Sequence, residues 1–269
     1  MSDVNQNLSK EGLANLAIDP DLLARELAAQ LAGDPLDEIE LDKTDEDLVN
    51  SSKECDIALK WLQSGNEERL QGLRVFCEHR DSRALPFLVP LLDEPSPVVR
   101  MSAVYALGRN PCPQAIDLLL HLLRFDSNAY VRKATAWSLG NYSNAPVLEP
   151  LINALKQDVA AVRLWASSSL AEVGLNSLES SLPAANQLLE SLQIDGEPIV
   201  RSNCIWSLGR LYIHLSEEIK IQVVEAFISV LLNDREPSVR YEARTALDQL
   251  DNQEVQKKLK SLIDDGLLV

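Results

Sequence analysis

The sequence is poor in the residues that strand-rich proteins use and in long apolar runs. It contains 10 glycines and 5% aromatic residues, a composition that disfavours a β-sandwich or barrel with its many turns and aromatic strands. No apolar run approaches the ~20 residues that a membrane-spanning helix requires. The polar N-terminal stretch MSDVNQNLSKEGL lacks an apolar segment after a basic start, so we expect no secretory signal and a cytoplasmic location.

Motifs for metal binding and for nucleophilic catalysis are also lacking. Four cysteines, Cys55, Cys77, Cys112 and Cys204, form no C-x-x-C pair, and zinc-finger spacing is absent. No Ser–His–acid, Cys–His or phosphate-loop pattern occurs. We therefore predict free thiols, no metal site, no intrinsic cofactor and no catalytic residue. Cys112, in the loop RNPCPQ, is the cysteine that we expect to be most exposed.

Basic residues are outnumbered, with 25 Lys and Arg against 41 Asp and Glu and a net charge of −16. Residues 1–50 alone carry 13 acidic and 3 basic side chains, a balance of −10. This distribution argues against nucleic acid, whose phosphates require clustered cations, and against anionic membrane surfaces. It favours a protein partner.

What the sequence does contain is an internal repeat. The segments VVRMSAVYALG, YVRKATAWSLG, AVRLWASSSLA, IVRSNCIWSLG and SVRYEARTALD align with one another. Their anchor arginines are separated by 32, 31, 38 and 39 residues, and a weaker copy surrounds Arg69. The five anchors are Arg100, Arg132, Arg163, Arg201 and Arg240.

Each repeat predicts two helices joined by a short turn. Apolar segments such as AIDLLLHLL and VVEAFISVLL have helical periodicity and precede the anchor segments. Pro97, Pro198 and Pro237 mark the start of the second helix, and Gly108, Gly140 and Gly209 its expected end. The longer spacings before Arg201 and Arg240 indicate longer helices or loops in those repeats.

Stacking such hairpins buries faces that a single hairpin leaves exposed. We therefore predict an all-α fold, a right-handed α-solenoid of about six helical hairpins with a C-terminal capping helix after residue 251. Residues 53–269 form this solenoid, and residues 1–52 form an acidic N-terminal arm that is partly helical or disordered. Within the arm, 11–33 is a candidate helix and 34–50 an acidic linker.

An acidic residue lies about six positions before each anchor arginine, so neighbouring layers can pair acids with arginines in a ladder. We interpret this ladder as structural, setting register as well as stability, although isolated exposed pairs contribute little. Its members are Glu94, Arg100, Asp126, Arg132, Asp158, Arg163, Asp195, Arg201, Asp234 and Arg240.

The second helices carry aromatic residues away from the core. Counting from the anchor arginine, positions −1, 3 and 7 share the core face, whereas −2, 1, 2 and 5 face the other way. Exposed aromatic ribbons are typical of binding surfaces, so we predict a partner-binding concave face. The alternative is that position 5 packs sideways on the adjacent layer. The predicted face comprises Met101, Tyr105, Tyr130, Lys133, Trp137, Leu164, Trp165, Trp206 and Tyr241.

The motif V-R-x-x-A-x-x-x-L-G, best kept at 99–108 and with shifts at 131–140 and 200–209, resembles HEAT-like repeats of the phycobilisome-lyase type. The resemblance covers roughly residues 53–250. It implies one of several roles: a bilin lyase subunit, a phycobilisome turnover factor or a non-lyase scaffold. The run from VRKATAWSLGNY to VRSNCIWSLG is most similar to cyanobacterial HEAT-repeat proteins that partner an A-type iron–sulfur carrier.

Two functions therefore stay open. The first is a non-catalytic scaffold that binds a protein partner, an iron–sulfur carrier by the resemblance, with any cluster held by the carrier's cysteines. The second is a phycobilin lyase subunit, a bilin or phycobiliprotein chaperone, or a phycobilisome turnover factor. The repeat motif identifies the fold and leaves the activity undecided. Bilin propionates call for nearby cations, and on the predicted face Lys133 is the clearest one, with Arg74 and Arg244 beside it.

Overall fold

The computed structural model describes residues 45–142, 145–176, 178–250 and 252–267. Within these ranges the secondary structure consists of thirteen α-helices and four short 3-10 helices, with no strand. The all-α prediction is therefore confirmed for the described part of the chain. None of the helices described is long and apolar enough to cross a membrane.

The chain divides into two units, residues 1–50 and 51–269. Of the first unit the structure describes only residues 45–50, which are the first turns of α3 (Asp45–Trp61). The predicted boundary at 52/53 therefore falls inside a helix, and the last residues of the predicted acidic linker are helical. The predicted helix over 11–33 lies outside the described residues.

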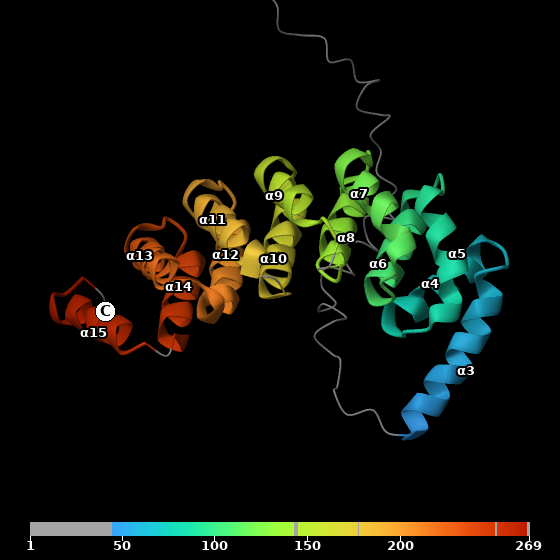
Figure 1. Cartoon of the computed structure of the whole chain (residues 1–269), viewed down its shortest axis with the longest axis horizontal. Helices are drawn as coiled ribbons and strands as arrows, with labels where there is room; N and C mark the ends of the chain where they lie inside the picture. The colour runs from blue at the N-terminus through green and yellow to red at the C-terminus, as the bar shows by residue number, and fades with distance from the viewer. Residues whose placement is uncertain (1–44, 143–144, 177, 251, 268–269) are drawn as a thin grey trace, which may run out of the picture. The chain divides into compact units, whose positions relative to one another are not determined.

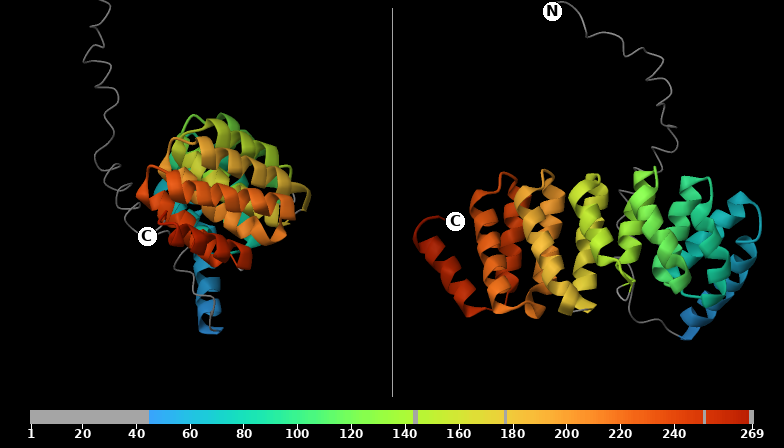
Figure 2. Two further views of the ribbon diagram at one scale, coloured as in Figure 1. Left: turned by 90° about the vertical axis from the view of Figure 1, so that its left-hand side faces the viewer. Right: turned by 45° about the horizontal axis from the view of Figure 1, so that its top comes forward.

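Six helical hairpins follow one another and are completed by α15 (Gln253–Asp264), as the repeat predicts. Their first helices form one row and their second helices another, and Figures 1 and 2 show these rows side by side. The first helices are α3, α5 (Leu85–Leu88) with its 3-10 extension Val89–Asp93, α7 (Ile116–Phe125), α9 (Leu148–Gln157), α11 (Leu178–Ile194) and α13 (Glu217–Asn233). The second helices are α4 (Asn66–Glu78), α6 (Pro97–Arg109), α8 (Ala129–Leu139), α10 (Ala160–Asn176), α12 (Pro198–Leu211) and α14 (Pro237–Gln249). We call the latter the second-helix row.

Local sequence signals set the starts of the second helices. Pro97, Pro198 and Pro237 are the first residues of α6, α12 and α14, where a missing N–H costs no hydrogen bond. Asn128 caps α8 instead, because its side-chain oxygen accepts hydrogen bonds from the N–H groups of Tyr130 and Val131. The long anchor spacings reside in α11 and α13, which have 17 residues each against 10 in α7 and α9.

The core lies between the two rows, and the predicted core face of the second helices is confirmed. Positions −1, 3 and 7 relative to the anchor arginine are buried in all five clear repeats, Cys204 included. Successive second helices pack on one another along the whole row. In α15 the buried residues are Val255 and Leu259, so the helix covers the last hairpin with one apolar face, as expected of a cap.

Of the three glycines predicted to end the second helices, Gly140 does so and the other two do not. Gly140 is the C-terminal cap of α8, but Gly108 lies within α6, which ends at Arg109, and Gly209 within α12, which ends at Leu211. None of the three has a positive φ. Gly108 and Gly140 instead allow close packing by Trp137 and Ser169 of the next layer, whereas nothing lies within 4 Å of a Cβ added at Gly209.

Candidate functional site

The structure distributes the predicted partner-binding residues over two degrees of exposure. Tyr130, Trp206 and Tyr241 are exposed, and Tyr241 has 72% of its surface accessible. The others are half-buried, most of them against the core: Met101, Tyr105, Lys133, Trp137, Leu164 and Trp165. The predicted aromatic ribbon is thus interrupted, and its exposed part on the second-helix row lies at Tyr130 and then on α12 and α14.

Trp137, expected on an open face, packs sideways on the preceding layer. Its ring lies 5.3 Å from the ring of Tyr105, between centroids, at an interplanar angle of 53°. It also covers Gly108, where an added Cβ would come within 2.4 Å of the indole Cζ3. For Trp137 the contact matches the alternative in which position 5 packs on the adjacent layer, because a side chain long enough to lie across its neighbour buries apolar area by doing so.

Trp206 occupies the equivalent position of α12 and stays accessible, with 43% of its surface exposed. The guanidinium of Arg210 lies over one face of its ring, 4.9 Å from the centroid, and Arg210 is itself ion-paired with Glu172 of α10. The indole is therefore held by a cation that is already neutralised, which leaves an aromatic surface with little net charge.

A second line of exposed apolar side chains follows the starts of the second helices. Val98, Tyr130 and Ile199 stand two residues before their anchor arginines and are all exposed. The predicted partner-binding face includes Tyr130 from this position but neither Val98 nor Ile199. The same −2 register contained the signal for Val98 and Ile199.

The acidic and basic residues form a ladder along the row, with each rung joining two layers. Arg132 illustrates the rung: its Nε and Nη2 donate to the two oxygens of Asp158 in the next layer at 2.8 and 2.7 Å. Its Nη1 donates to the backbone oxygen of Asp126 in its own layer at 2.9 Å. One guanidinium thereby fixes its own turn and the neighbouring layer together. The same pattern joins Arg100 to Asp126, Arg163 to Asp195 and Arg201 to Asp234.

The two ends of the ladder differ from its middle. Glu94 accepts from Arg69 of the degenerate first repeat at 3.1 Å. Arg240, at the other end, donates to the backbone oxygen of Asp234 at 2.7 Å but has no ion pair with any carboxylate that the structure describes. The regular rungs therefore join the second to the sixth hairpin, and the first rung is a single hydrogen bond.

Partial burial makes the rungs more than surface ion pairs. The arginine side chains of the four regular rungs are only 13–19% exposed. Burial opposes ionisation of Asp126, but hydrogen bonds from Arg100 and from the Asn128 N–H outweigh it and lower the pKa of Asp126. Hydrogen bonds from Arg201 likewise hold the pKa of Asp234 below its usual value.

The cysteines are not placed for metal or redox chemistry. Cys112, predicted to be the most exposed, is buried with 4% of its surface accessible. Tyr142 of the next layer covers this loop: its hydroxyl accepts from the Cys112 N–H and donates to the Leu107 carbonyl. The half-buried cysteine is Cys77, whose pKa burial raises to about 12, so its thiol is protonated at neutral pH.

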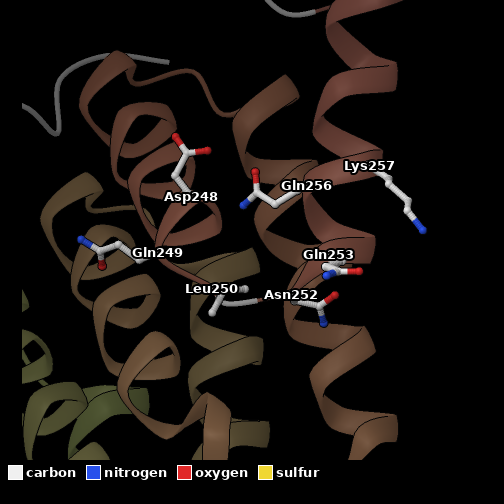
Figure 3. Close-up of a pocket in the computed structure, with 7 residues that line it drawn as sticks. All are labelled: Asp248, Gln249, Leu250, Asn252, Gln253, Gln256 and Lys257. Carbon is white, nitrogen blue, oxygen red and sulfur yellow. The ribbon is translucent and has the colours of Figure 1, made fainter.

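An open cavity of about 520 Å³ lies between the end of α14 and the start of α15. Figure 3 shows its lining, in which Lys257 points away from the other labelled side chains. The lining residues are Asp248, Gln249, Leu250, Asn252, Gln253, Gln256 and Lys257. They are mostly amides and offer no nucleophile beside a base, so this cavity carries no evident chemistry.

Sequence comparison connects these hairpins to a known repeat. A family model described as HEAT repeats matches residues 57–140, 118–209 and 185–267, which together span the described solenoid. The chain belongs to the HEAT-repeat family. A search of curated proteins finds no match for this HEAT-repeat chain.

Solved structures show the same fold at low sequence identity. A designed armadillo repeat protein in complex with the peptide (KR)4 is 21% identical, with a TM-score of 0.53 over 71% of this chain and 97% of that one. The complex of CpcE and CpcF of phycocyanin lyase from Nostoc sp. PCC7120 gives 22% identity and a TM-score of 0.51 over 62% and 99%. A chain of the Kap95:Nup1 complex gives 17% identity and a TM-score of 0.57 over 90% of this chain and 35% of that one. Identities this low establish the α-solenoid and no activity.

Proposed function

We propose that this HEAT-repeat chain is a non-catalytic interaction scaffold that binds a protein partner on the second-helix row, at α12 and α14. The observation that carries the proposal is the exposure of Trp206 and Tyr241 on these neighbouring helices. In the earlier layers the aromatic residues Tyr105, Trp137 and Trp165 are half-buried instead. Exposed tryptophan and tyrosine side chains are the residue types that dominate binding energy at protein interfaces.

Structural neighbours support a protein partner in general terms. The designed armadillo protein was solved with a peptide, and Kap95 with Nup1. Both are solenoids of stacked helices, whose extended surfaces suit polypeptide ligands. These examples support a polypeptide as the class of partner, but they do not identify it.

An iron–sulfur carrier is the partner that the sequence resemblance suggests. The described cysteines fit poorly as cluster ligands, because Cys55, Cys112 and Cys204 are buried and free and the thiol pKa values of Cys77 and Cys204 are raised by burial. A cluster requires thiolates at an accessible position. In this proposal the partner therefore supplies all the ligands, and this chain supplies the docking surface.

A bilin-related role is the second candidate, supported by the structural similarity to the phycocyanin lyase complex and by the exposed aromatic side chains. The cations fit a bilin less well. Arg210 and Arg244 are engaged by Glu172 and Asp248. This leaves the half-buried Lys133 and the exposed Arg74, neither of which has an ion pair to any described residue. Bilin propionates would find few free cations on this row, so the scaffold is favoured.

The test is a pull-down from a native lysate with wild type and the double variant Trp206→Ala/Tyr241→Ala. Phe125→Ala is the matched control, because Phe125 is an exposed aromatic residue on the first-helix row. We expect a protein that the wild type and the control retain and the double variant loses. Its identity, and the visible spectrum of the eluate, decide between an iron–sulfur carrier and a bilin protein. Equal retention by all three proteins would contradict the proposed surface.

A further inference from the structure

Three residues of the second and third hairpins form an aromatic contact between layers. Tyr105 and Gly108 lie five and eight residues after their anchor arginine on α6, and Trp137 lies five residues after its anchor on α8. The Trp137 ring packs beside Tyr105 and directly over Gly108. Glycine is required there because any Cβ would collide with the indole. The contact thus needs an aromatic residue, a glycine one turn later and an incoming ring.

The first two components recur on α12, but the third does not. Trp206 takes the position of Tyr105 and Gly209 that of Gly108, whereas the next helix, α14, has Thr245 where α8 has Trp137. An added Cβ at Gly209 would meet nothing within 4 Å, and Gly209 is partly exposed. We call the surface formed by Trp206 and Gly209 the Gly209 shelf.

The intermediate layer shows that a small residue at position five does not by itself leave a shelf open. After Gly140 the corresponding residue on α10 is Ser168, yet Ser169 closes the space, with its Oγ 2.8 Å from an added Cβ. Ser169 is held there by a 2.7 Å hydrogen bond to the Ala136 carbonyl. Of these three glycines, Gly209 alone is left uncovered.

We infer that the Gly209 shelf receives an aromatic side chain of the protein partner, which lies over Gly209 and against Trp206 as Trp137 lies over Gly108 and against Tyr105. This inference rests on the proposed function and names the chemistry of the partner. A flat ring fits because the shelf has no Cβ to hold it away from the helix. The Glu172 carboxylate neutralises Arg210 beside Trp206, so the shelf selects for aromatic surface rather than for charge.

The experiment uses the full chain and a probe of defined chemistry, N-acetyl-tryptophanamide, with N-acetyl-leucinamide as the control probe. Binding is followed by NMR at the Gly209 backbone amide and the Trp206 indole N–H. We expect saturable shifts with the aromatic probe and much smaller ones with the aliphatic probe. The variant Thr245→Trp supplies the missing internal ring and should lose the response, whereas Thr245→Ala leaves the shelf open and should keep it.

No shift at the highest soluble concentration of the aromatic probe would overturn the inference, as would an unchanged response in folded Thr245→Trp. Equal shifts with the two probes would contradict the inferred preference of the shelf for an aromatic side chain. The titration contains no partner, so its failure is distinct from failure of the proposed function, which the pull-down tests. With a captured partner in hand, Thr245→Trp should abolish its binding and Thr245→Ala should preserve it; loss in both would contradict the shelf.

Discussion

Alanine at Gly108 and at Gly209 is the same change at the same repeat position, yet the structure predicts opposite effects on stability. Both glycines lie in helical segments, where alanine is favoured over glycine by about 1 kcal/mol. At Gly209 the new methyl group meets open space, so the propensity gain should be realised in full. At Gly108 the methyl group would come within 2.4 Å of Trp137 Cζ3, and the indole must move.

The collision has an estimable cost. Overpacking of a filled site typically costs about 1–3 kcal/mol, which exceeds the propensity gain at Gly108. We therefore expect Gly209→Ala to raise the free energy of unfolding by about 1 kcal/mol and Gly108→Ala to lower it by up to about 2 kcal/mol. The two variants should differ in Tm by several degrees, since 1 kcal/mol corresponds to about 2–4 °C in a domain of this size.

Urea and thermal unfolding, followed by far-UV circular dichroism, measure this difference. Tryptophan fluorescence reports separately whether the Trp137 environment changes in Gly108→Ala. Trp137→Ala/Gly108→Ala is the internal control, because without the indole the alanine at 108 should again be favourable. Equal stabilisation by Gly108→Ala and Gly209→Ala would refute the packing argument and, with it, the template for the Gly209 shelf.

Three further predictions follow from the same structure. Trp137→Ala should lower the free energy of unfolding by about 2 kcal/mol, roughly half the cost of truncating a fully buried tryptophan. Trp206→Ala should lower it by about 1 kcal/mol or less, mainly through loss of the contact with Arg210. Similar losses for both variants in urea unfolding would contradict the different exposures of the two side chains. The pKa of Asp234 is lowered from 3.8 by Arg201, so the stabilisation by the Asp234 carboxylate is present above pH 3.8 and is lost as the pH falls through the pKa of the folded state. Asp234→Asn should therefore reduce the loss of unfolding free energy on acidification, measured by urea unfolding at several pH values. The same loss in wild type and variant would show that the pair of Asp234 and Arg201 does not stabilise the fold. Deletion of residues 1–44 should leave helicity and cooperative unfolding intact, and loss of cooperativity in circular dichroism would show that the arm packs on the repeats.

Periodicity made most of the fold predictable. A core face at positions −1, 3 and 7 follows from the 3.6-residue helical repeat, and the structure buries those positions from Val99 to Leu247. The acid–arginine spacing also anticipated which charges lie on neighbouring layers. Asp158, one residue out of register in sequence, still pairs with Arg132, because the turn after α9 places it at the same helix end.

Exposure on the non-core face was less predictable, because it depends on the neighbouring layer. Trp137 and Trp206 have the same position and nearly the same local sequence, AWSLG and IWSLG. Trp137 packs on Gly108 and Tyr105 of the preceding layer, whereas Trp206 follows a layer with Ala171 and Ser168 at those positions. Cys112 shows the same limit: its loop looks exposed in sequence, and Tyr142, thirty residues later, buries it.

In a repeat protein the regular positions and the irregular ones therefore carry different information. The ladder and the core recur because every layer must bind its neighbours in one register, and these residues would be needed whatever the partner. A residue that departs from the repeat pattern is not needed to join neighbouring layers. Thr245 stands where α8 has Trp137, and the Gly209 shelf is uncovered; Tyr241 on the same helix is 72% exposed. Both residues belong to α14, which packs on α12 with its exposed Trp206, and for this reason we propose the binding surface in the last two hairpins rather than along the whole row.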